Sequence, residues 1–97
     1  MASKMEYLDF ILEQLDLLDN ITYRSMMGEF LLYYRQVLIG GIYDDRLLVK
    51  IAKENKKYGM KETIPYPGAK PMYLASDVDD KELLKNVVLD TYKCLRK

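Results

Sequence analysis

The sequence contains no histidine and only one cysteine among its 97 residues. Histidine is the commonest general base and metal ligand in proteins, so its absence removes the usual Ser-His and Cys-His catalytic pairs. The single cysteine, Cys94, excludes an internal disulfide and a conventional structural zinc site. We therefore expect a protein that is not an enzyme and that carries no cofactor or metal.

Long apolar runs and an excess of charge of either sign are also missing. No apolar run approaches the roughly 20 residues that a membrane-spanning helix requires, and the N-terminus lacks the basic-then-apolar plan of a secretory signal. The formal net charge is zero, so no global field attracts the chain to nucleic acid or to an anionic membrane. These features predict a cytoplasmic protein with no membrane partner.

What remains is a globular composition, 49% hydrophobic and 31% charged, in one domain over residues 1–97. A helix is expected to begin with a capping box between Ser3 and Glu6 and to end at Asp19 and Asn20. A second helix is expected to begin at Asp79, with Val78 as a hydrophobic staple, and to bury Cys94. The residues between the two helices predict strands, so the fold class is α+β.

Residues 26–51 predict three antiparallel strands folded into a meander. Gly28 is expected to interrupt the first strand, while Arg35-Gln36 and Asp44-Asp45 form two tight turns. A short helix is expected over residues 53–58, ended by Gly59. A last strand is expected over residues 72–76. Gly40 and Gly41 lie inside a strand, where they are expected to make room for neighbouring side chains rather than to bind phosphate.

Two-residue turns imply a register in which Leu32 faces Ile39 and Gly41 faces Leu48. One face of the sheet then collects Leu31, Tyr33, Leu38, Ile42, Leu47, Val49 and Ile51. The opposite face collects Phe30, Leu32, Tyr34, Val37, Ile39, Tyr43 and Leu48, rimmed by Arg46 and Lys50. The helices are expected on the first face. Because a wet face would alternate apolar and polar residues, the second face predicts a homodimer or a protein partner.

The predicted partner interface consists of Phe30, Leu32, Tyr34, Ile39, Tyr43, Arg46 and Leu48. An alternative is a nucleic-acid-associated regulator that contacts phosphates through Lys53, Lys56, Lys57 and Lys61. Nucleic-acid surfaces favour arginine, exposed aromatics and excess positive charge, and only Tyr58 and Tyr66 lie nearby, so a solvated patch is favoured. A third alternative is a small-ligand binder, which requires a pocket lined by tyrosine and aspartate.

Three motifs resemble the N-terminal domain of TfoX/Sxy-type proteins. They are Tyr-Arg-Ser-Met-Met-Gly at residues 23–28, Tyr-Asp-Asp-Arg-Leu at residues 43–47 with Lys50, and Gly-Ala-Lys-Pro-Met at residues 68–72. The likeness covers nearly the whole chain in order. Met27 and Glu29 stand where the family's first-strand motif has phenylalanine and glycine, which suggests a divergent branch.

The resemblance implies a two-layer fold ordered α-β-β-β-α-β-β-α, similar to secretion chaperones, in which dimers are common. Full-length members are bacterial regulators of natural competence that act beside a cyclic-AMP-responsive transcription activator, and they carry a second, C-terminal domain. Residues 1–97 correspond to the first domain alone. The resemblance therefore implies a stand-alone regulatory or protein-interaction module, and the family motifs contribute no catalytic residues.

Overall fold

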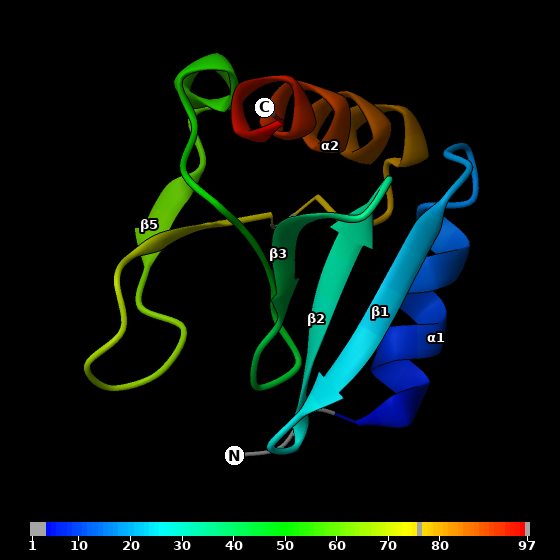
Figure 1. Ribbon diagram of the computed structural model, residues 1–97, viewed down its shortest axis with the longest axis vertical. Coiled ribbons are helices and arrows are strands. Elements are labelled where there is room, and N and C mark those ends of the chain that lie inside the picture. Colours follow the sequence, from blue (N-terminus) through cyan, green and yellow to red (C-terminus); the bar gives the residue numbers. More distant parts are fainter. Residues whose placement is uncertain (1–3, 76, 97) are drawn as a thin grey trace.

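The computed structural model describes residues 4–75 and 77–96, which form a six-stranded antiparallel sheet with two α-helices and a short 3₁₀ helix (Figure 1). In chain order the elements are α1 (Met5–Gln14), β1 (Ile21–Met26), β2 (Glu29–Tyr34), β3 (Val37–Ile42), β4 (Leu47–Val49), η1 (Lys53–Tyr58), β5 (Lys61–Thr63), β6 (Met72–Leu74) and α2 (Lys81–Leu95). The strands lie in the order β1-β2-β3-β4-β6-β5. The α+β class and the expected element order are confirmed, and β1 is a further strand that lies almost entirely before the predicted meander of residues 26–51.

Two-residue turns connect β1 to β2, β2 to β3 and β3 to β4. Both central residues of each turn have positive φ: 51° and 86° at Met27-Gly28, 50° and 70° at Arg35-Gln36, and 53° and 55° at Asp44-Asp45. This backbone matches the right-handed twist of the flanking strands. The turns at Arg35-Gln36 and Asp44-Asp45 are as predicted, whereas Gly28 lies in the turn between β1 and β2 instead of inside a strand.

A β-bulge at Ile39 changes the predicted register between β2 and β3. Tyr33 pairs with Leu38, but Leu32 pairs with Gly40, so Ile39 is the extra residue on β3. Gly40 follows the bulge, and a Cβ atom there would overlap the carbonyl oxygen of Leu48. Because side chains alternate along a strand, one extra residue reverses the facing of everything paired beyond it.

The core lies between the sheet and both α-helices. Its buried residues are Leu8, Ile11, Leu15, Phe30, Leu32, Tyr34, Ile39, Ile42, Leu47, Ala75, Leu84 and Val88. Leu47 and Ile42 face the helices as predicted. Phe30, Leu32, Tyr34 and Ile39 do so too, which makes their predicted place on an outward partner surface wrong. The bulge is the reason, because it reverses which side chains of β2 face the helices relative to the predicted register.

The first helix ends earlier than predicted. Gln14 is its last residue, and the chain then turns through hydrogen bonds from the Asp16 N–H to the Glu13 carbonyl and from the Leu18 N–H to the Leu15 carbonyl. Asn20, with φ at 64°, leads into β1. Ser3, the first half of the expected capping box, lies outside the described residues.

The second helix begins one residue later than predicted. Its N-cap is Asp80, whose Oδ1 accepts a hydrogen bond of 3.0 Å from the Leu83 N–H. Gly59 ends η1 in the left-handed conformation, as expected. Cys94 is half-buried and not a core residue, and its Sγ accepts a hydrogen bond from the Glu54 N–H. Of the strand expected over residues 72–76, β6 forms residues 72–74, and Ser76 lies outside the described residues.

Candidate functional site

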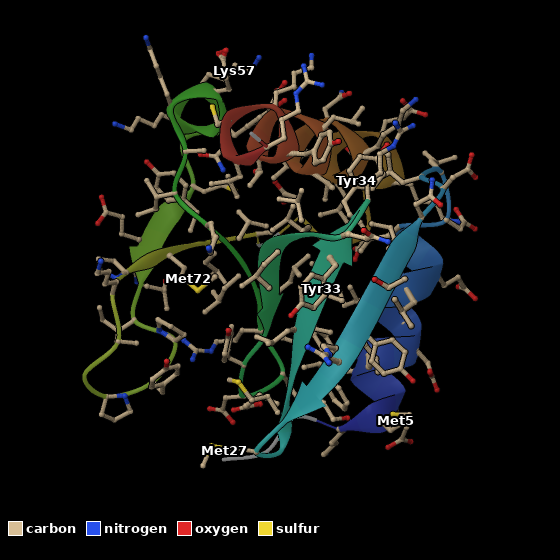
Figure 2. All side chains as sticks on the ribbon, in the orientation of Figure 1. Met5, Met27, Tyr33, Tyr34, Lys57 and Met72 are labelled. Atoms are coloured by element: carbon tan, nitrogen blue, oxygen red, sulfur yellow. The ribbon has the colours of Figure 1, made fainter. Side chains whose placement is uncertain are left out.

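The side of the sheet opposite the core is apolar, and we call it the outer face. Register places Leu31, Gly41, Leu48 and Leu74 side by side across β2, β3, β4 and β6. Leu48 is fully buried, whereas Leu31 and Leu74 are half-buried. Tyr33 and Leu38, which pair with each other, are half-buried on the same side. Figure 2 shows Tyr33 in front of the sheet and Tyr34 beside α2.

Residues 64–71 fold over one part of the outer face. The Arg46 side chain holds this segment, donating from Nε to the Tyr43 carbonyl at 3.1 Å and from Nη2 to the Pro65 carbonyl at 3.3 Å. The rings of Tyr43 and Tyr66 lie 6.0 Å apart. A Cβ atom on Gly41 would be 2.9 Å from Cε2 of Tyr43, so the Tyr43 ring occupies space that a side chain at residue 41 would need. Tyr43 and Arg46, both predicted interface residues, therefore make contacts within the chain.

A groove of about 640 Å³ lies between this segment, the neighbouring strands and the end of α2. Its apolar wall includes Tyr43, Ile51, Pro65, Tyr66, Met72 and Leu95, and its charged lining residues are Lys50 and Lys70. The pocket expected of a small-ligand binder was to combine tyrosine with aspartate, whereas this groove combines tyrosine with lysine. Burial, together with Tyr66, Glu29 and Tyr33, raises the pKa of Tyr43, so its phenol is a neutral hydrogen-bond donor at neutral pH.

A buried polar cluster joins η1 to α2, and sequence analysis did not find it. The Asn55 side chain is fully buried. Its Oδ1 accepts from the Ala52 N–H at 3.0 Å, and its Nδ2 donates to the Lys50 carbonyl at 2.8 Å and to Thr91 Oγ1 at 2.7 Å. Thr91 in turn donates to the Val87 carbonyl. Asn55 stands among charged residues in Lys-Glu-Asn-Lys-Lys-Tyr, so neither its neighbours nor its spacing signalled burial.

Tyr58 and Asp90 form a second link between the same two elements. The Tyr58 hydroxyl donates to Asp90 Oδ2 at 2.5 Å, and Lys57 Nζ lies 3.2 Å from the same oxygen. Burial, the hydrogen bond and the charge of Asp90 raise the pKa of Tyr58 to about 12. Burial alone would raise the pKa of Asp90, but the bonds from Tyr58 and Lys57 and the charge of Lys93 hold it below its ordinary value.

The predicted phosphate-contact lysines are all exposed, but they are not equivalent. Lys53, Lys56 and Lys57 belong to η1, and Lys61 begins β5. Lys57 is already paired with Asp90. Within residues 4–75 and 77–96, the amines of Lys53, Lys56 and Lys61 make no ion pair. The structure thus leaves three of the four lysine charges open to solvent.

Residues 4–75 and 77–96 hold neither a metal-ligand cluster nor a membrane-spanning helix. No group of three or more histidine, cysteine, aspartate or glutamate side chains there is arranged to hold a metal ion. No described helix is both long enough and apolar enough to cross a membrane.

Comparison with known proteins adds one relative. No family model matches the chain. The curated "Uncharacterized 12.7 kDa protein in trpE 5'region" of Spirochaeta aurantia is 31% identical over 80 residues, which cover 80% of this chain and 70% of the relative. At this identity and coverage, the chain belongs to the same family as the Spirochaeta protein.

Proposed function

We propose that this chain is a non-catalytic regulatory module that acts by protein–protein contact in the cytoplasm and forms a homodimer through the outer face. The observation that carries the proposal is the patch formed by Leu31, Tyr33 and Leu38. These side chains are half-buried, while the core helices pack on the opposite side of the sheet. An apolar patch on a sheet face is typical of a surface that another protein covers.

The surroundings of the patch resemble those of a protein interface. On β1, Thr22 pairs with Tyr33 and Arg24 pairs with Leu31, so both lie on the outer face, and both are exposed. An apolar centre with tyrosine, arginine and a polar rim is typical of protein interfaces. A second copy fits this patch because its centre carries no charge that would repel an identical surface. The cytoplasmic assignment is supported by Cys94, which remains a free thiol.

The regulatory part of the proposal is supported by the resemblance to the N-terminal domain of TfoX/Sxy-type proteins, whose implied fold order agrees with the observed one. In that reading the dimer presents its remaining surfaces to a regulatory partner. Affinity purification from the native host with the wild-type chain and with Leu38→Asp tests this step. Recovery of the same partners at the same yield would show that the outer face is not needed for partner binding.

The homodimer is tested by light scattering coupled to size exclusion over a wide concentration range. The wild type is expected at twice the 11.4 kDa chain mass. Leu38→Asp is expected at the chain mass, because it places a charge in the centre of the patch. Asn86→Asp adds the same charge at an exposed position on α2 and should remain dimeric. Circular dichroism confirms that each variant is folded, and a strictly monomeric wild type at high micromolar concentration would refute the dimer.

The exposed amines of Lys53, Lys56 and Lys61 support a second candidate, the nucleic-acid-associated regulator. Such binding would weaken steeply with salt, because lysine–phosphate contacts release condensed counterions. A mobility-shift assay with duplex DNA and with RNA at low salt tests it. No shift is expected, whereas a salt-sensitive shift that is lost in the triple alanine variant of these lysines would favour this candidate over the outer-face proposal.

A further inference from the structure

The groove beside residues 64–71 carries positive charge without internal compensation. Lys50 and Lys70 both line it, and its lining contains no acidic residue. Within the described ranges, neither amine has an ion pair or a side-chain hydrogen bond. Each ammonium group offers three donors. The groove is therefore ready to receive a negatively charged group.

The rest of the groove favours hydrocarbon. The rings of Tyr43 and Tyr66 lie at a tilt of 45° to each other, and Pro65 is the buried residue of the segment. Met72 and Leu95 extend the apolar wall, and Met72 is labelled in Figure 2. A volume of about 640 Å³ falls within the range of roughly 300–1,000 Å³ typical of small-molecule sites. A strongly hydrated ion without an apolar part would leave this wall unused.

The groove is held open by contacts within the chain. Arg46 ties the Pro65 carbonyl to the end of β3. A turn closed by the hydrogen bond from the Ala69 N–H to the Tyr66 carbonyl, with Gly68 at φ 88°, places Lys70 on the same side as Tyr66. Met72 belongs to β6, which pairs with β4 in the sheet. Because contacts within the chain already order the segment, binding would cost little conformational entropy there.

We propose that the groove binds a small carboxylic acid with an apolar body, its carboxylate directed at Lys50 and Lys70 and its body packed on Tyr43, Tyr66 and Met72. This site is separate from the patch of Leu31, Tyr33 and Leu38, so the proposal does not depend on the homodimer. The charge of the groove selects a carboxylate over its neutral amide. The apolar wall selects a compound with a hydrocarbon body over acetate.

A titration followed by two-dimensional amide NMR tests the proposal, with 4-phenylbutyrate as the probe and 4-phenylbutanamide as its neutral match. At low salt the acid is expected to bind about tenfold more tightly than the amide, because two solvent-exposed ion pairs contribute about that much together. The largest shifts are expected at the amides of Tyr66, Ala69, Lys70 and Met72. Equal affinity for acid and amide, or shifts centred elsewhere, would overturn the proposal.

Three variants test the contribution of the two lysine charges separately from that of the apolar wall. The double variant Lys50→Met, Lys70→Met should bind the acid no better than the amide. Lys56→Met removes the same charge from η1, outside the groove, and should bind the acid as the wild type does. Tyr66→Ala should weaken acid and amide alike, because it removes part of the wall. Acid binding by the double variant at wild-type affinity would refute the role of the lysines, and the spectrum of each variant reports its folding.

Discussion

Two segments that connect strands of the sheet pack on the rest of the fold, and they are held in different ways. The helix η1 packs on α2 through Asn55, whose side chain makes three hydrogen bonds in a fully buried position, and through Tyr58. Residues 64–71 pack on the outer face through Arg46 and the pair of Tyr43 and Tyr66. The first contact satisfies its polar groups internally, whereas the second leaves two lysine amines and an apolar groove open.

This difference indicates that the contact of η1 with α2 serves stability, whereas the surface beside residues 64–71 is suited to binding. A buried polar group contributes to stability only when it is fully paired, and a partner lost from such a cluster is costly. A surface that binds other molecules needs unpaired charge and uncovered apolar area. We therefore expect substitutions at η1 to change the free energy of unfolding and substitutions around residues 64–71 to change binding and local mobility.

The largest effect is expected for Asn55→Ala. It removes three hydrogen bonds, leaves the Ala52 N–H and the Lys50 carbonyl unpaired, and opens a cavity. The free energy of unfolding is expected to fall by about 3 kcal/mol in urea denaturation. Lys56→Ala, at the adjacent exposed position, should change it by less than about 0.5 kcal/mol. Equal effects at the two positions would show that η1 does not rely on the buried cluster.

Tyr58→Phe is expected to have the next largest effect. It removes only the hydroxyl that donates to Asp90 and leaves the ring in place. Hydrogen bonds to charged groups contribute about 1.5 kcal/mol or more. The free energy of unfolding, measured by urea denaturation at neutral pH, should therefore fall by about that amount. Tyr66→Phe removes the hydroxyl of an exposed tyrosine outside this contact and is the matched control. A loss of stability in the control as large as that in Tyr58→Phe would contradict the assignment.

The same pair predicts how stability depends on pH. The pKa of Tyr58 is about 12 in the folded chain against an ordinary value of 10.0, so its contribution is complete below pH 10 and is lost as the pH rises toward 12. The pKa of Asp90 is lowered from 3.8, so its contribution is complete above that value and is lost as the pH falls below it. When the free energy of unfolding is plotted against pH, the curves of the wild type and of Tyr58→Phe should converge at the alkaline end. Parallel curves across that range would exclude the link to Tyr58.

A smaller effect on stability is expected for Arg46→Lys. Lysine keeps the charge but lacks the fork that reaches the Tyr43 and Pro65 carbonyls together. The free energy of unfolding should fall by about 1 kcal/mol, while hydrogen exchange at the Ala69 amide becomes faster. Arg24→Lys makes the same substitution at an exposed position on β1. Unchanged exchange at Ala69 in Arg46→Lys would mean that Arg46 does not hold the segment.

Local signals were enough to predict much of the fold. Arg35-Gln36 and Asp44-Asp45 lie between apolar runs, and both are two-residue turns. The capping pattern at Asp79 located the start of α2 to within one residue, and Gly59 marked the end of η1. The candidate site was predicted less well. The sequence did suggest that both sheet faces are apolar, but it assigned Phe30 and Leu32 to the outer face.

The chain sequence determined the elements, their order and the apolar nature of both sheet faces, because periodicity, turns and caps act over a few residues. Only the tertiary structure decided which face meets the helices. Residues 30–34, Phe-Leu-Leu-Tyr-Tyr, are apolar on both sides, so alternation carries no information there, and a single extra residue at Ile39 settles the facing. The groove likewise depends on packing, since Tyr43, Tyr66 and Leu95 are distant in sequence and meet only when the sheet forms.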